Sequence, residues 1–138
     1  MTAKEKPVPV PIEEDRPYWE GARAHRLVLQ RCKGCGLYSS RPRVICPRCH
    51  TDEFEWSQVS GKGKIHSYSI VWQTTVRGFE DEVPYVVCNA QIDEEPTCYV
   101  TANLLVDQSA HVNLDIHLPV VIDFEDRGEV VVPQWRLA

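Results

Sequence analysis

Residues 32–49 read CKGCGLYSSRPRVICPRC. They contain two Cys-x-x-Cys pairs, Cys32/Cys35 and Cys46/Cys49, with ten residues between the pairs. Each pair predicts a tight turn that points two sulfurs at one spot, and two facing turns supply the four thiolates of a closed tetrahedral zinc site. Because sulfur takes all four positions, no position is left for an activated water, and we expect one structural zinc ion per chain. The stretch therefore predicts a zinc ribbon.

The other residues of this stretch suit two metal-binding turns. Gly34 and Gly36 flank Cys35 and relieve the steric cost of positive φ angles, and Pro47 stiffens the turn after Cys46. The alternative is a pair of disulfides, which requires an oxidising compartment. The first residues, MTAKEKPVPVPIEED, lack the apolar core of a secretory signal, so the sequence favours zinc.

The bulk composition favours a soluble, mostly β protein. The chain has 138 residues, enough for one real core, and its ten prolines and seven glycines favour short strands and turns over helices. No stretch approaches the roughly 18 apolar residues that are needed to span a bilayer. We therefore expect a cytoplasmic protein with no membrane partner.

Charge divides the chain into a basic and an acidic part. Residues 23–64 carry nine Lys/Arg against three Asp/Glu, whereas residues 65–138 carry three against twelve. A solvated surface accounts for such a pattern, but the basic part also suits a nucleic acid, a phosphorylated cofactor or an acidic partner. Its basic side chains are Arg23, Arg26, Arg31, Lys33, Arg41, Arg43, Arg48, Lys62 and Lys64.

Residues 1–26 are expected to form an arm and a helix. Alternating Pro and Val favour an extended arm over residues 1–11. Three acidic residues precede Pro17, a pattern that suits a helix N-terminus, and apolar residues then recur at near-helical spacing. The pattern predicts a helix over 13–25.

Three large apolar side chains are candidates for docking on a partner protein. A helix this short is marginal alone, so the face with Tyr18 and Trp19 must pack on the protein's own core or on a partner. Phe79 lies in the acidic loop 77–84 and is expected to be exposed. It is either the tip of a solvated hairpin or a contact for a partner.

Residues 27–59 are expected to form the ribbon and residues 60–138 an OB-fold barrel. The predicted ribbon strands cover 27–31, 37–40 and 54–57, and the SGKGK run at 60–64 predicts a hinge between the two modules. Five strand patterns with a long first strand follow, separated by turn signals that include 107–109, and suit a small closed barrel. They cover 65–76, 85–92, 98–105, 120–125 and 130–135 and are antiparallel by their turns.

No catalytic constellation is visible in the sequence. The histidines at 25, 50, 66, 111 and 117 are scattered, and none pairs with a Cys, Ser or acid at a recognisable catalytic spacing. Cys88 and Cys98 lie inside apolar runs and are expected to be plain buried cysteines. The pattern favours a binding module or a non-catalytic subunit over an enzyme that acts alone.

An ordered set of motifs resembles a known family. The motifs are PYWEG at 17–21, LVLQRCKGCG at 27–36, RPR at 41–43, CPRC at 46–49, SGKGKI at 60–65 and PYVV at 84–87. Together they resemble the rubredoxin-like zinc-ribbon and OB-fold proteins first catalogued as domain of unknown function number thirty-five. Two turns depart from the family pattern: DEEP at 93–96 stands where relatives tend to read Asp-Glu-Gly, and HLPV at 117–120 replaces Gly-x-Pro-Val.

The resemblance implies a role in acyl-CoA metabolism. Members of the family are small partners of thiolase-superfamily enzymes that make or break carbon–carbon bonds in coenzyme A thioesters, with the catalytic residues on the partner chain. For this chain it implies a non-catalytic subunit of a thiolase or retro-aldolase complex with two copies of each chain, and an acyl-CoA thioester as the shared substrate. We expect Arg41, Arg43 and Lys62 to meet the phosphates of coenzyme A. The three apolar side chains named above would then dock on the partner.

Two other functions stay open at this point. A nucleic-acid-binding protein also combines ribbons and OB-folds, although the acidic barrel part would repel a phosphate backbone. A stand-alone acyl-CoA-binding or hydratase module is the second alternative, and no acid/base pair for it is identifiable. The sequence does not name the acyl group, the pathway or the partner chain.

Overall fold

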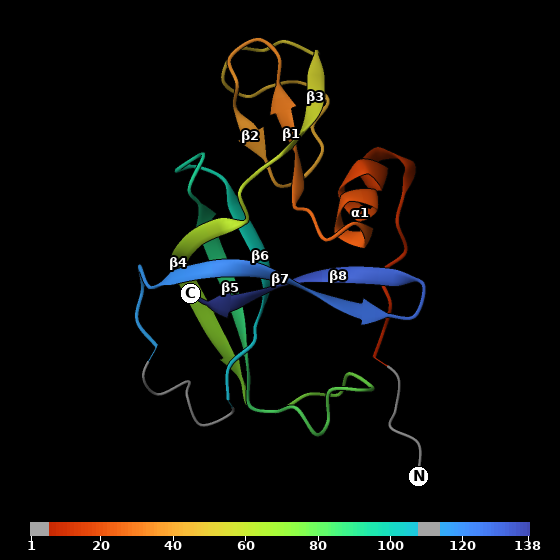
Figure 1. Cartoon of the computed structure of the whole chain (residues 1–138), viewed down its shortest axis with the longest axis vertical. Helices are drawn as coiled ribbons and strands as arrows, with labels where there is room; N and C mark the ends of the chain where they lie inside the picture. The colour runs from red at the N-terminus through yellow and green to blue at the C-terminus, as the bar shows by residue number, and fades with distance from the viewer. Residues whose placement is uncertain (1–5, 108–113) are drawn as a thin grey trace.

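The computed structural model of the chain describes residues 6–107 and 114–138. Within these ranges a short helix and a three-stranded sheet precede a closed five-stranded barrel, and the sheet stands at one end of the barrel (Figure 1). This confirms the predicted mostly β class, with an N-terminal helix, a ribbon and an OB-fold barrel in that order. Residues 1–5 of the predicted arm and residues 108–109 of the predicted turn lie outside the described residues.

The N-terminal helix is shorter than the sequence predicts. A 3-10 turn, η1 (Glu13–Asp15), leads into α1 (Arg16–Arg23), so the helix ends before residue 25. His25 takes a positive φ of 58°, and the N–H of Arg26 donates to the carbonyl oxygen of Gly21 at 2.8 Å, which closes the last turn. No helix among the described residues is long and apolar enough to cross a membrane.

Helix α1 packs on the protein's own core. It contacts strand β8 (Val130–Leu137) of the barrel and strand β1 (Val28–Cys32) of the ribbon. A Cβ atom at Gly21 would collide with the side chain of Val28, so glycine permits the close approach of the helix to β1. Tyr18 packs against the buried core, which is one of the two outcomes expected for this face.

The ribbon sheet is built around its central strand. Strand β1 pairs antiparallel with β2 (Tyr38–Ser39) on one side and with β3 (Phe54–Gln58) on the other. The predicted ribbon strands are thereby confirmed, with shifts at their ends. The first cysteine pair therefore lies at the end of β1 and in the turn that follows it, and the second pair lies in the loop that precedes β3.

The barrel has the strand order β4-β5-β6-β8-β7. Its strands are β4 (Lys62–Val71), β5 (Tyr85–Ile92), β6 (Tyr99–Leu104), β7 (Pro119–Arg127) and β8. Strands β6 and β8 are parallel, so the expectation of an entirely antiparallel barrel is wrong at this seam. The cause is the order of the strands along the chain. After β6 comes β7, which pairs with β4. Strand β8 then pairs antiparallel with β7 and lies between β7 and β6. This strand order is typical of an OB-fold.

The predicted hinge at 60–64 is wrong for its second half. Strand β4 begins at Lys62, where it pairs with β7 and then with β5. A Cβ atom at Gly63 would collide with the carbonyl oxygen of Gln91, so this glycine serves the close approach of two strands and not flexibility. At its other end β4 stops at Val71, short of the predicted residue 76.

The core lies inside the barrel. Trp135 is fully buried, and its indole N–H donates to the carbonyl oxygen of Val100 at 3.0 Å. Leu27 and Leu29, from the base of the ribbon, belong to the same apolar cluster. The ribbon therefore rests on the barrel core.

Cys88 and Cys98 are buried, as expected. Burial raises the pKa of each thiol to about 11, which keeps both in the neutral form at physiological pH.

Candidate metal centre

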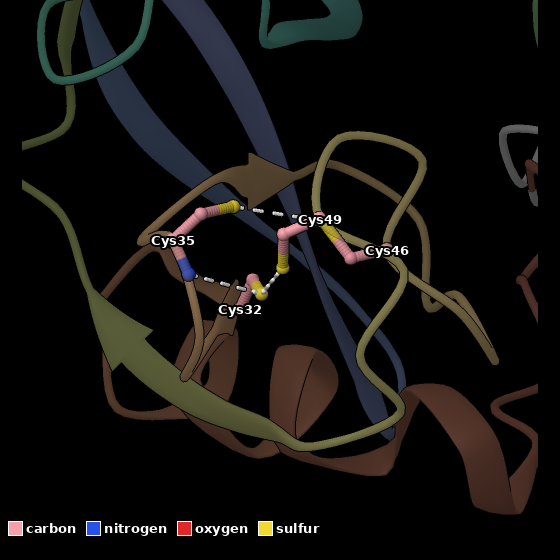
Figure 2. Close-up of side chains that lie close together, drawn as sticks. All are labelled: Cys32, Cys35, Cys46 and Cys49. Atoms are coloured by element: carbon pink, nitrogen blue, oxygen red, sulfur yellow. Dashed lines mark hydrogen bonds between the residues drawn. The ribbon is translucent and has the colours of Figure 1, made fainter.

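The four ribbon cysteines meet at one point. Cys32 ends β1 and Cys35 follows in the first turn, while Cys46 and Cys49 come from the second turn (Figure 2). Their four sulfurs all lie within 4.8 Å of one another. The Sγ atoms of Cys32 and Cys49 are 3.4 Å apart, and those of Cys35 and Cys46 are 3.6 Å apart.

These sulfur spacings suit a metal ion and not disulfides. A tetrahedral zinc ion with Zn–S bonds of about 2.3 Å holds its sulfurs about 3.8 Å apart, whereas a disulfide bond is about 2.0 Å long. All six cysteines of the chain are free. The four cysteines therefore form a possible zinc site, and the pair of disulfides considered above does not describe this structure.

Backbone groups hold the two turns in place. Two backbone N–H groups of the first turn donate to Cys32 Sγ, at 3.3 and 3.4 Å. Gly36 has a φ of 80° and its N–H donates to the carbonyl oxygen of Cys32 at 2.9 Å. His50 repeats this geometry in the second turn, with a φ of 66° and an N–H that donates to Cys46 at 2.9 Å. The sequence predicted the glycine but not that a histidine fills the equivalent position.

Arg48 joins the metal centre to the barrel. Its Nε donates to Cys35 Sγ at 3.4 Å, and its Nη2 donates to the carbonyl oxygen of Cys35 at 3.0 Å. Its Nη1 lies 3.8 Å from a carboxylate oxygen of Glu95, which is in the turn between β5 and β6. The hydrogen bond from Arg48 is the main cause that lowers the pKa of the Cys35 thiol to about 6. This favours the thiolate, which is the form that binds metal.

The turn 93–96, which departs from the family pattern, is where the barrel holds the ribbon. Glu94 accepts hydrogen bonds from the backbone N–H and the hydroxyl of Ser60, just after the last ribbon strand. Glu95 faces Arg48 from the same turn. The two acids thus contact the ribbon module at two separate points.

Two of the predicted coenzyme A residues lie in the loop after β2. Arg41 and Arg43 are exposed there. The side chain of the buried Gln30 exchanges two hydrogen bonds with the main chain of Arg43, at 2.8 and 3.2 Å. Arg43 Nε also donates to Ser39 Oγ at 3.1 Å, so its guanidinium is held in one direction.

Lys62, the third predicted coenzyme A residue, belongs to the barrel. It opens β4 and lines a cavity of 440 Å³ together with Lys64 and His117. The two arginines do not line this cavity. The structure therefore places the three residues on two different modules.

The three predicted docking residues line one cavity. Tyr18, Trp19 and Phe79 border a space of 220 Å³ between α1 and the barrel. The expected exposure of Phe79 is wrong, because the side chain is only 7% exposed. Lys6 Nζ lies 5.1 Å and the Arg127 guanidinium 5.4 Å from its ring centroid. Both cations come from distant parts of the chain, so the composition of the loop gave no signal. The docking role of the three side chains stays a prediction.

Family models match most of the chain. Residues 19–55 match the model described as "ChsH2, rubredoxin-like zinc ribbon domain", and residues 56–125 match "ChsH2, C-terminal OB-fold domain". Fold and site together define a class of protein, a zinc ribbon joined to an OB-fold barrel. The chain belongs to the ChsH2-type family of such proteins, which confirms the resemblance drawn from the sequence motifs.

Curated relatives are similar to parts of the chain or to nearly all of it. A "probable enoyl-CoA hydratase alpha subunit" of Thermomonospora curvata is 33% identical over 129 residues, which is 92% of this chain and 39% of the relative. A "DUF35 domain-containing scaffold protein" of Methanocaldococcus jannaschii is 41% identical over 69 residues, 49% of this chain and 48% of the relative. One of the same name from Pyrococcus furiosus is 38% identical over 88 residues, 62% of each chain. The chain spans less than two thirds of the length of these relatives.

Solved structures share the fold. A chain of the "Ltp2-ChsH2(DUF35) aldolase" matches with a TM-score of 0.81 at 27% identity, over 94% of this chain and 98% of that chain. A DUF35-family protein of unknown function from Sulfolobus solfataricus matches with a TM-score of 0.61 at 11% identity, over 91% and 86% of the two chains. The second likeness shows the fold alone.

Proposed function

We propose that this chain is a non-catalytic, zinc-stabilised subunit of an enzyme complex that makes or breaks carbon–carbon bonds in acyl-CoA thioesters. The observation that carries the proposal is the likeness to a chain of the Ltp2-ChsH2 aldolase, which extends over 94% of this chain and 98% of that one. The partner is a chain of the thiolase superfamily, with two copies of each chain in the complex. The acyl-CoA thioester is the substrate that both chains share.

Zinc has a structural role in this proposal. Cys32, Cys35, Cys46 and Cys49 would hold one ion and close its coordination sphere, so the ion supplies folding free energy and activates no water. The metal-bound turns then fix Arg48, which faces Glu95 of the barrel. In this way the ion sets the position of the ribbon as well as its fold.

The basic loop after β2 serves the coenzyme A end of the substrate. A guanidinium grips two phosphate oxygens through parallel N–H groups, and a side chain that is already held loses less entropy when it binds. Arg43 meets this condition, since Gln30 and Ser39 hold it in place. Arg41 adds charge beside it, and Lys62 approaches from the barrel.

Co-expression with a thiolase-superfamily partner tests the proposal. The cleavage or thiolysis of a panel of acyl-CoA thioesters is measured with the chain alone, the partner alone and both together. We expect turnover that needs both chains, and gel filtration of a complex with equal numbers of each. Turnover by the purified single chain contradicts the proposal. So does a partner whose turnover is the same with and without this chain.

A hydratase-associated module is the second candidate. It is favoured by the likeness to the probable enoyl-CoA hydratase alpha subunit, of which this chain covers only 39%. In that case the chain would assist a hydratase domain supplied by another polypeptide. Adding an enoyl-CoA thioester to the same panel separates the two candidates. Fluorescence anisotropy with labelled single-stranded DNA against a coenzyme A thioester tests the nucleic-acid alternative.

A further inference from the structure

The segment that precedes η1 alternates proline with other residues. It reads KPVPVPI over residues 6–12, and we call these residues the proline rod. The ring of each proline fixes its φ angle at about −65°, and each residue before a proline is pushed out of the helical region. The structure contains neither a turn nor a bend over these residues. The rod therefore has the extended conformation that is typical of a polyproline II helix.

The exposure of the rod follows the three-residue repeat of such a helix. Lys6 and Pro9, three positions apart, are half-buried, whereas the residues between them and the two that follow are exposed. Val8 is 45% and Val10 is 84% exposed, and Ile12, at the entry to η1, is 55% exposed. One face of the rod thus lies toward the protein, and the other two faces present apolar side chains to solvent.

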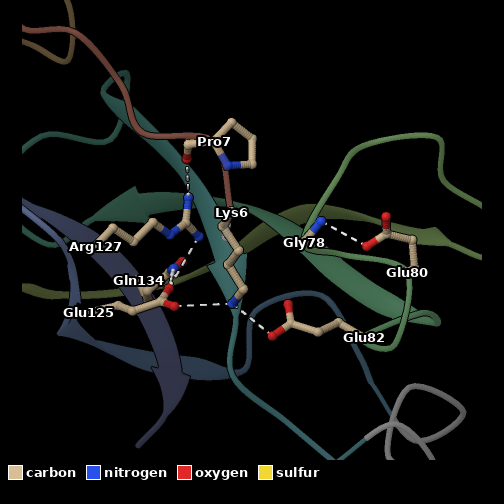
Figure 3. Close-up of polar contacts among 8 residues, drawn as sticks. All are labelled: Lys6, Pro7, Gly78, Glu80, Glu82, Glu125, Arg127 and Gln134. Atoms are coloured by element: carbon tan, nitrogen blue, oxygen red, sulfur yellow. Dashed lines mark hydrogen bonds and ion pairs between the residues drawn. The ribbon is translucent and has the colours of Figure 1, made fainter. Parts of the chain in front are cut away.

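The first end of the rod is fixed to the barrel. Lys6 Nζ pairs with Glu82 at 2.7 Å and with Glu125 at 3.0 Å (Figure 3). The Nη1 group of Arg127 donates to the carbonyl oxygen of Pro7 at 3.5 Å (Figure 3). These contacts join the start of the rod to β7 and to the loop before β5.

The second end of the rod is fixed by η1. The N–H of Ile12 donates to Asp15 Oδ1 at 2.9 Å, and the N–H of Asp15 donates to the carbonyl oxygen of Ile12 at 3.3 Å. Between the two ends, the carbonyl oxygens of residues 8–11 accept no hydrogen bond from the part of the chain that the structure describes. A segment that is held at both ends has already lost the entropy that a free arm would lose on binding. The rod therefore presents its valines and carbonyl oxygens in a fixed shape.

A groove lined by aromatic rings is the surface that fits such a rod. Proline rings and valine methyl groups pack on aromatic faces, and indole N–H or phenol O–H groups donate to the free carbonyl oxygens. No charged side chain lies between Lys6 and Glu13, so the groove should be uncharged along its length. Just after the rod, Glu13 pairs with Arg16, whereas Glu14 is exposed and has no ion pair among the described residues. A basic side chain at that end of the groove would complement Glu14.

We propose that the proline rod docks in an aromatic groove on the thiolase-superfamily partner, with its two exposed faces in the groove and Glu14 beside a basic side chain. The inference rests on the proposed function, because the partner is the chain named there. It adds a contact that the three predicted docking residues do not include, and it states the chemistry of the surface that receives the rod.

Two valines of equal exposure test the contact. Val10 on the rod and Val44 on the ribbon are both 84% exposed, so replacing either with serine should leave the fold intact, which thermal unfolding checks. The dissociation constant of the co-expressed complex is measured by analytical ultracentrifugation of a dilution series. Val10→Ser should weaken the complex about tenfold, because a buried valine is lost from the interface. Val44→Ser should assemble as the wild type does; an unchanged affinity for Val10→Ser overturns the proposal.

A pair of peptides tests the conformation of the rod. The affinity of the purified partner for a fluorescein-labelled, amidated KPVPVPI peptide is measured by fluorescence anisotropy. The control peptide KGVGVGI keeps the apolar side chains but frees the backbone, so it should bind about tenfold more weakly or less tightly still. Equal binding of the two peptides, or binding of neither, overturns the proposal.

The acidic end of the rod has its own test. Glu14→Gln should weaken the complex severalfold at low salt and much less at high salt, because salt screens an exposed charge pair. Glu55→Gln, at an exposed position on the ribbon, is the control and should have no effect. An unchanged affinity for Glu14→Gln at low salt contradicts the basic side chain assigned to the groove.

Assembly separates this inference from the proposed function. If the wild-type complex forms but Val10→Ser assembles as well as Val44→Ser and the partner binds neither peptide, the rod contact is wrong while the subunit role stands. If the wild-type chain forms no complex with the partner, the subunit role and the rod contact are both wrong.

Discussion

The ribbon and the barrel are stabilised in different ways. The ribbon sheet has three strands, one of which, β2, is two residues long, whereas the barrel closes five strands of six to ten residues on themselves. The fully buried side chains of the barrel include Trp135, Ile65 and Val86. The outer half of the ribbon buries little besides Cys32 and Cys46, since Leu27 and Leu29 belong to the barrel cluster.

This difference follows from size. Below about 40 residues a module rarely buries enough apolar surface to fold without a cross-link or a metal. The ribbon depends on the cysteines of its two turns and on the barrel at its base, whereas the barrel depends on neither the ribbon nor these cysteines. We therefore expect the dependence to run in one direction, and the following changes test it.

Cys46→Ser should have the largest effect. Structural zinc contributes on the order of 10 kcal/mol to such sites, so removing one ligand should release the metal and unfold the outer ribbon. The β signal of the barrel in circular dichroism should largely remain. Elemental analysis and amide hydrogen exchange measure the two effects. Cys88→Ala, inside the barrel, is the control and should keep its zinc; a Cys46→Ser protein with a full complement of zinc would contradict the assigned ligand set.

Trp135→Ala tests the stability of the barrel. Removing a large buried side chain costs about 3–5 kcal/mol, and here it also leaves the Val100 carbonyl without its donor. Urea unfolding should show this loss, and the ribbon should lose its protected amides together with the barrel because its base rests on the same cluster. Trp72→Ala, at a position that is 59% exposed, should change stability little. A ribbon that stays protected above an unfolded barrel would show that the two modules fold independently.

Arg48→Ala tests the contact between the metal-binding turns of the ribbon and the barrel. Loss of a group that supports a metal ligand typically costs about 10–100-fold in metal affinity, and Arg48 supports Cys35 through two hydrogen bonds. Competition with a chelator measures the zinc affinity. Arg41→Ala removes an equal charge from the same loop region and should leave the affinity unchanged. Equal affinities in all three proteins would mean that Arg48 plays no part in holding the metal.

Glu125→Gln tests the barrel's own polar cluster through pH. Burial raises the pKa of Glu125, but hydrogen bonds from Lys6 and Gln134 and the neighbouring Arg127 outweigh it and bring the pKa below its ordinary 4.5. The stabilisation is therefore fully present above pH 4.5 and is lost as the pH falls through the lower, folded pKa. The side chain is partly exposed, so we expect a loss of roughly 1 kcal/mol at neutral pH. Thermal unfolding between acidic and neutral pH should show a flatter profile for the variant than for the wild type or for Glu55→Gln on the ribbon surface.

Arg43→Ala should have the smallest effect on the fold and a measurable one on the substrate. Gln30 bonds the main chain of Arg43, so the loop should keep its shape without the guanidinium. We expect the KM for the acyl-CoA thioester to rise severalfold in the assembled complex, while gel filtration shows normal assembly. Loss of assembly with unchanged kinetics in the remaining complex would assign Arg43 to docking instead of coenzyme A binding.

Local patterns predicted the ribbon and most strands, whereas contacts between distant segments could not be read from the sequence. The cysteine spacing placed four sulfurs together because each pair is confined to one turn. By contrast, the burial of Phe79 depends on Lys6 and Arg127, which lie far from it along the chain. Gly63 suggested a hinge because the group that requires a glycine at this position, the carbonyl of Gln91, belongs to another strand. Arg48 lies between the cysteines of the second pair, and this position beside two ligands was the one available signal for its role.

The bond between Lys6 and Glu125 constrains the order in which the chain folds. Its two ends are 119 positions apart, so this contact cannot form until strand β7 is in place, whereas the ion pair between Lys6 and Glu82 can form earlier. During synthesis Glu125 is added 119 residues after Lys6, so this contact must wait until the ribbon and strands β4 to β6 have been made. Contacts of such separation form late because the entropy of closing the loop is lost before the contact stabilises anything. The contact between Lys6 and Glu125 should therefore be one of the last to form, and Lys6→Ala should speed unfolding while leaving the folding rate nearly unchanged.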